Sequence, residues 1–201
     1  PTSALITDMS QPLAPSLGNA LEVADVMRVL TGASTGRLYD LTLALGDAVL
    51  TSAGIEGGAE KIEDAIASGA AAEKFGAMVY ALGGPVHFVE DWPRFLPEAP
   101  VIREVPAPTG GEVSEIDGER LGLAVVALGG GRQVETDQVD PAVGLSDVVS
   151  LGDSLAKGQP LARIHAAREA QADAAVKAVQ DAITLDGASP PAPKLILERV
   201  T

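Results

Sequence analysis

Few side chains in this sequence have the chemistry of an acid, a base or a nucleophile. The 201 residues include no cysteine and only two histidines, His87 and His165. The lack of cysteine excludes disulfides, thiolate metal sites and cysteine nucleophiles, and two histidines are too few for a histidine-rich metal centre. No acidic partner stands at catalytic spacing from either one, so we interpret both histidines as structural.

A glycine run offers a second kind of chemistry. In Leu128-Gly129-Gly130-Gly131-Arg132, backbone N–H groups can cradle an anion while the arginine supplies the counter-charge. No Gly-Lys-Ser/Thr follows, and the run comes after an expected helix rather than a strand. We therefore favour the end of a helix, followed by a mobile loop that runs from Gly129 to Gly144.

Two further segments, 107–113 and 152–161, resemble the turns and strands of biotinyl- and lipoyl-type domains. A glycine-supported tight turn returns the chain for sheet pairing in such folds. A carrier domain must also present a lysine on an exposed hairpin. The corresponding place here is 164–168, which reads Ile-His-Ala-Ala-Arg. We expect the barrel-like fold without the carrier function.

Charge excludes several partners. The chain carries 14 basic and 28 acidic residues, a formal net charge of −14. Nucleic acids and anionic membrane surfaces both require basic surfaces, so neither is an expected partner. No run of 18 apolar residues and no signal peptide is visible, which predicts a cytoplasmic protein.

The first domain is expected over residues 1–84. Ser3–Thr7 has the pattern of a short buried strand. Helical spacing of apolar residues, with glycines at the ends, predicts four helices: 20–31, 38–53, 59–68 and 71–82. One strand and four helices are typical of the rear of an α/β domain. Because a strand at the very start needs neighbours, we interpret the sequence as a fragment.

A proline-rich linker is expected over residues 85–106, with a strand at 101–105 and with Trp92 and Phe95 as packing anchors. The second domain is expected over residues 107–201. Its predicted strands are 111–116, 152–153, 161–164 and 195–197, its predicted helices are 120–128 and 168–185, and a polyproline-like spacer is predicted at 189–193.

An ordered series of motifs resembles the pyrimidine-nucleoside phosphorylase family. The motifs lie at 7–13, 18–23, 72–79, 121–132, 143–147 and 152–161. The resemblance spans essentially the whole chain but only the C-terminal half of a family member. It implies an α/β (α+β) architecture: the rear of the phosphate-side α/β domain, then a C-terminal α/β-hammerhead domain.

The resemblance also implies a function. The family converts thymidine and phosphate to thymine and 2-deoxyribose 1-phosphate, as a homodimer. The groups that bind phosphate and the pyrimidine lie in the N-terminal half of family members and have no counterpart here. We therefore expect no catalytic and no cofactor-binding residue in this chain, which would be inactive alone. In the family, the segment that holds Gly129, Gly130, Gly131 and Arg132 lies near the interdomain cleft. The alternative is a non-catalytic interaction domain that reuses this scaffold.

One cation site is implied in part. Bacterial relatives hold a monovalent cation with backbone oxygens and an acid at positions that match Leu13, Ser16 and Asp25. The family often has glutamate at the last position. Oxygen-only ligation suits a hard cation such as K⁺, and no other cofactor is required. An ordinary loop at the start of a helix is the alternative.

Overall fold

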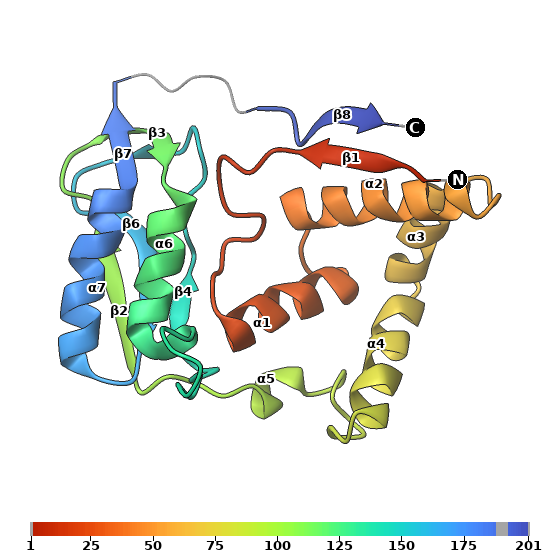
Figure 1. Cartoon of the computed structure of the whole chain (residues 1–201), viewed down its shortest axis with the longest axis horizontal. Coiled ribbons are helices and arrows are strands. Elements are labelled where there is room, and N and C mark those ends of the chain that lie inside the picture. The colour runs from red at the N-terminus through yellow and green to blue at the C-terminus, as the bar shows by residue number, and fades with distance from the viewer. Residues whose placement is uncertain (1, 188–192, 201) are drawn as a thin grey trace. The chain divides into compact units, whose positions relative to one another are not determined.

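A strand from each end of the chain forms one small sheet (Figure 1). In the computed structural model, which describes residues 2–187 and 193–200, β1 (Ala4–Thr7) pairs antiparallel with β8 (Ile196–Val200). The predicted strand at 3–7 is confirmed, but it is half-exposed rather than buried, because Ala4 and Ile6 face solvent. Most of the predicted spacer, residues 189–192, lies outside the described residues.

The four predicted helices are confirmed, and each begins and ends one residue earlier than predicted. They are α1 (Asn19–Leu30), α2 (Arg37–Ser52), α3 (Gly58–Ala67) and α4 (Ala70–Ala81). At the start of α1, the Glu22 carboxylate accepts a hydrogen bond from the Gly18 N–H at 3.0 Å. The acidic side chain thus satisfies the backbone donor of the residue just before the helix.

The expected linker at 85–106 is folded rather than extended. It contains α5 (Trp92–Phe95) and β2 (Val101–Pro106). Phe88 is buried between Phe75 and Phe95, with ring centroids 6.1 and 6.2 Å away. The guanidinium of Arg28 lies 5.9 Å from the centre of the Trp92 ring. The packed aromatic side chains stabilise this segment. The proline of α5 lies in the first turn of the helix, where its missing N–H costs no helical hydrogen bond.

Two three-stranded antiparallel sheets, α6 and α7 form most of the remaining chain that the structure describes. One sheet has the order β2–β6–β4 and the other β5–β3–β7. Their remaining elements are β3 (Gly111–Ile116), α6 (Gly118–Val125), β4 (Gly144–Ser146), β5 (Ser154–Leu155), β6 (Pro160–Ala166), α7 (Glu169–Ala182) and β7 (Ile183–Asp186). α7 packs on β2 and β6, and one continuous apolar core joins both sheets to the helices.

Three expectations for this region need correction. The helix predicted at 168–185 ends at Ala182, and the chain continues as β7, where Ile183 pairs with Ile116 of β3. The strand predicted at 152–153 is a turn, and the strand follows it as β5. The helix predicted at 120–128 is α6, which continues into a wider π-helical turn at Val126–Gly130.

The predicted domains 1–84 and 107–201 stay a prediction, and the chain separates into two compact units along other boundaries. One unit contains the chain up to Asp8, residues 24–95 and the chain from Lys194 onwards, and the other contains residues 9–23 and 96–193. Residues 9–23, which we call the strap, thus belong with the sheets of the second unit. In the described residues, no helix is long and apolar enough to cross a membrane.

Backbone hydrogen bonds hold the strap in place. Leu17 and Leu145 exchange two of them, at 2.9 and 2.7 Å. The Ala20 N–H donates to the carbonyl of Pro141, and the Val148 N–H donates to the carbonyl of Pro15. Because these hydrogen bonds lie on both sides of the Leu17–Leu145 pair, the strap forms an additional edge of the second unit.

Two glycines permit the close approach of the strap to β4, which we call the crossing. Gly18 (φ 136°) and Gly144 (φ 154°) lie where L-residues are rarely found. A β-carbon at Gly18 would lie 2.6 Å from the Val143 carbonyl oxygen, and one at Gly144 would overlap the Leu17 carbonyl oxygen. Both obstacles are backbone atoms, so a side chain at either position must push the strap away.

We expect Gly144→Ala to lower the free energy of unfolding by at least about 2 kcal/mol, because it combines strain at positive φ with a backbone clash. Urea unfolding measures this change. Gly122→Ala is the matched control, since Gly122 lies inside α6 with open space around it; there alanine should stabilise by roughly 0.5–1 kcal/mol. Equal stability of Gly144→Ala and the unmodified chain would contradict the role given to the crossing.

Candidate functional site

The three residues expected to hold a cation differ in their surroundings. Leu13 and Ser16 lie in the strap, and Asp25 lies in the part of α1 that belongs to the first unit. Ser16 and Asp25 are buried, whereas Leu13 is 37% exposed. One carboxylate oxygen of Asp25, Oδ1, accepts a hydrogen bond from Arg28 Nη1 at 2.5 Å. The other, Oδ2, is buried, and within the described residues no donor reaches it.

The unpartnered Oδ2 of Asp25 has the chemistry of a cation ligand. A buried acceptor without a donor costs on the order of 1–3 kcal/mol, and more when it is charged. A bound cation would remove this cost, and oxygen ligands suit a hard cation. Asp25 therefore fits the implied role, and cation binding by the three residues stays a prediction. Among the described residues, no group of three or more histidines and acids could hold a metal ion.

The glycine run ends α6 rather than opening a helix. Gly129 has a non-helical backbone (φ 100°), and its carbonyl accepts a hydrogen bond from the Asp140 N–H at 2.9 Å. The next backbone donors, at Gln133 and Val134, point to the Asp137 carboxylate at 3.0 and 3.1 Å. An acid of the loop thus occupies donors that an anion would need, which favours the interpretation of a helix end and a loop.

A serine and a histidine meet between β4 and β6, a contact that the sequence did not reveal. Ser146 Oγ lies 2.9 Å from His165 Nε2. The neighbouring Asp147, at positive φ, pairs with Arg163 at 3.2 Å, and Arg163 also reaches Glu104. Since β4 has only three residues and was not predicted, no sequence signal placed Ser146 beside His165.

Electrostatics at this pair favour a neutral imidazole. Burial lowers the pKa of His165 below its ordinary value; Asp147 opposes this change, and Arg163 adds to it. A half-buried, neutral imidazole that shares a hydrogen bond with Ser146 joins the two strands. The geometry supports the structural interpretation of His165, although a Ser–His contact is also what a nucleophile and its base would show.

The comparison with protein families addresses the same part of the chain. Residues 112–186, which include the glycine run, Ser146 and His165, match the family described as "Pyrimidine nucleoside phosphorylase C-terminal domain". The chain contains a pyrimidine nucleoside phosphorylase C-terminal domain. In the structure, this phosphorylase domain contains both sheets apart from β2.

Similarity extends beyond that domain to the whole chain. A thymidine phosphorylase of Burkholderia cenocepacia (strain HI2424) is 46% identical over 204 residues, which cover 99% of this chain and 46% of that protein. A thymidine phosphorylase of Agrobacterium fabrum (strain C58) is 40% identical over 206 residues, which cover 100% of this chain and 47% of that protein. The chain is thus homologous to the C-terminal part of thymidine phosphorylase and spans about half the length of these relatives.

The mobility expected for Gly129–Gly144 stays a prediction. The exposure of its residues shows to which part of the loop the prediction applies. Residues 132–136 and 138 are exposed, whereas Ala142, Val143 and Gly144 are buried beneath the strap. We expect amides at 132–138 of the phosphorylase domain to exchange with solvent fastest among its internal loops, and Leu145, bonded to Leu17, to exchange slowly. Hydrogen exchange with mass spectrometry measures both rates, and strong protection across 132–138 would contradict the expectation.

A second prediction concerns pH. Because burial lowers the pKa of folded His165 below 6.5, the unfolded chain binds more protons as pH falls through 6.5. His165 therefore stabilises the fold above that pH, and this contribution is lost as pH falls further. His165→Gln should flatten the fall in unfolding free energy between pH 7 and pH 5, measured by urea unfolding at each pH.

The same substitution at His87, whose side chain is 80% exposed, serves as the control for removing a histidine. A His165→Gln profile that stays parallel to that of the unmodified chain would show that His165 is not the buried titrating group.

Proposed function

We propose that this chain forms the C-terminal part of a thymidine phosphorylase and is inactive alone. The complete enzyme would convert thymidine and phosphate to thymine and 2-deoxyribose 1-phosphate. The observation that carries the proposal is the match to thymidine phosphorylases along 99% of this chain but only 46% of theirs. More than half of the relatives' residues therefore have no equivalent here.

The charges of this chain support the proposal that the phosphate-binding groups lie elsewhere in the enzyme. Phosphorolysis needs preorganised cationic and hydrogen-bonding groups around phosphate and the developing charge on the sugar. The chain carries a net charge of −14, which repels a phosphate dianion. Arg103 pairs with Glu169 and Asp173, and Arg163 with Glu104 and Asp147, so carboxylates already engage both guanidinium groups. The groups that bind phosphate and thymidine would come from the rest of the enzyme.

Two properties belong to the same proposal. Leu13, Ser16 and Asp25 would contribute oxygen ligands to a potassium ion, with Asp25 Oδ2 as the charged ligand. The complete enzyme would be a homodimer, as the family resemblance implies. The ion would neutralise a buried carboxylate oxygen and thereby fix the start of α1.

We expect the purified chain to release no thymine from thymidine and phosphate. A chimera in which the N-terminal part of the Burkholderia cenocepacia relative precedes this chain should release thymine, because it supplies the missing groups. The change in ultraviolet absorbance on thymine release measures both reactions, and the N-terminal part alone is the control. Thymine release by the isolated chain, or a folded but inactive chimera, would contradict the proposal; the second result favours the non-catalytic interaction domain.

The chimera also tests the cation. Replacing K⁺ by tetramethylammonium should lower the melting temperature of the chimera, and Asp25→Asn should abolish the difference between the two salts. A chimera indifferent to the salt would leave the phosphorolysis proposal standing and exclude the potassium site.

A further inference from the structure

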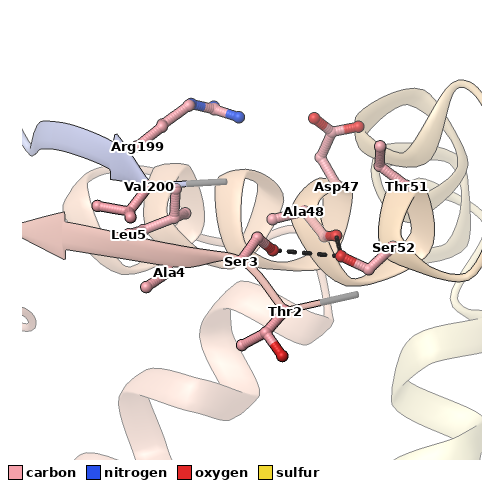
Figure 2. Close-up of a pocket in the computed structure, with 10 residues that line it drawn as sticks. All are labelled: Thr2, Ser3, Ala4, Leu5, Asp47, Ala48, Thr51, Ser52, Arg199 and Val200. Carbon is pink, nitrogen blue, oxygen red and sulfur yellow. Dashed lines mark hydrogen bonds between the residues drawn. The ribbon is translucent and has the colours of Figure 1, made fainter.

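Two carboxylates of the first unit differ in their surroundings in a way that bears on cation binding. Asp47 lies on the helix side of a groove of about 490 Å³ between α2 and the strands β1 and β8 (Figure 2). Its Oδ1 accepts a hydrogen bond from the Ala59 N–H at 3.2 Å, so this acid satisfies a donor in the first turn of α3. The side chain of Asp25 is only 7% exposed, and its Oδ2 has no donor among the described residues.

The two oxygens of Asp25 have different tasks. Oδ1 is engaged by Arg28, which lies three residues further along α1, with Nη1 at 2.5 Å. A charge-assisted hydrogen bond of this kind fixes the orientation of the carboxylate. Oδ2 receives no hydrogen bond from Arg28 or from another described group. The arginine thus holds the carboxylate by one oxygen and leaves the other for a different ligand.

Arg28 is itself held from a second side. Its guanidinium lies 5.9 Å from the centre of the Trp92 ring, within the range of a cation–π contact. Its side chain is 50% exposed, so the arginine reaches the buried acid from the surface of the unit. A guanidinium stays charged at any pH at which the protein is folded. Trp92 and Asp25 therefore keep a permanent positive charge beside the position of an ion at Oδ2.

This positive charge decides which ions the carboxylate can hold. Asp25 and Arg28 carry opposite unit charges, so the pair is neutral as a whole. A divalent ion at Oδ2 would meet twice the repulsion from the guanidinium that a monovalent ion meets. Divalent ions also require more from their ligands, because Mg²⁺ gives up water reluctantly and Ca²⁺ takes six to eight oxygens, usually including several carboxylates. The surroundings of Oδ2 thus favour a singly charged ion.

We propose that Arg28 is a specificity-determining residue of the potassium site and restricts that site to monovalent cations. It acts through Asp25, whose Oδ1 it occupies, and through its own charge. The inference rests on the potassium site of the proposed function. The alternative is an ordinary ion pair at i, i+3 spacing, which would stabilise α1 and leave the choice of ion unchanged.

Melting temperatures in different salts test the proposal, because a bound ion stabilises the folded protein. In the chimera, K⁺ should raise the melting temperature above its value in tetramethylammonium at equal ionic strength. Arg28→Met removes the charge but keeps an unbranched side chain beside Trp92. In this variant the Ca²⁺ concentration that gives half of the maximal rise should fall roughly tenfold or more relative to the unmodified chimera. Each variant is compared with itself in another salt, so the stability lost with the ion pair cancels.

Two further variants serve as controls. Arg94→Met removes a guanidinium that is 78% exposed and pairs with Asp91, and it should leave the response to both ions unchanged. Arg28→Lys keeps the positive charge and should keep the preference for K⁺. If K⁺ stabilises both the unmodified chimera and Arg28→Met, and Ca²⁺ acts equally on the two, the proposal is overturned and the potassium site remains.

The other outcomes separate this inference from the proposed function. Stabilisation by K⁺ that occurs only in Arg28→Met would overturn both the potassium site and the inference, because the guanidinium would then take the place of an ion. A lack of response to either cation in every variant would also overturn both, and thymine release by the same chimera would leave the phosphorolysis standing. A choice of ion that changes with Arg28 in a chimera that releases no thymine would keep the inference and reject the phosphorolysis.

Discussion

The close approach of two backbones, at Gly18 and Gly144, is the constraint on which the second unit depends. It sets the pairing of Leu17 with Leu145, and that pairing places Ala20 against Pro141 and Pro15 against Val148. The same contact fixes where the loop after α6 ends and where α1 begins. The positions of Leu13 and Ser16, the strap residues implied in cation binding, therefore depend on these two glycines.

The density of packing differs between the two units. Nine large side chains are fully buried in the described residues, and eight of them lie in the second unit; Met27 alone lies in the first. The second unit therefore has the core of an independent domain. The first unit has little such core, and no residue of α2 is buried.

Local signals predicted the helices, whereas contacts distant in sequence escaped prediction. The spacing of apolar residues and the glycines after them located α1 to α4 to within one residue. The sequence did not predict β7, because the helical spacing of apolar residues in α7 extends to Ile183. Pairing with β3 makes the segment from Ile183 onwards a strand. Ser146 and His165, nineteen residues apart, meet through sheet pairing that no local pattern encodes. Asp25 was predicted as a ligand by family resemblance, but its unpartnered buried oxygen is a product of the fold.

The pairing of β1 with β8 has a consequence for synthesis on the ribosome. Ala4 pairs with Val200, so β1 leaves the ribosome well before the residues of β8 with which it pairs. Loop closure over such a separation is slow, and domains that form during translation do so from nearer contacts. The elements between the two strands can therefore form first, and the β1–β8 pair follows them.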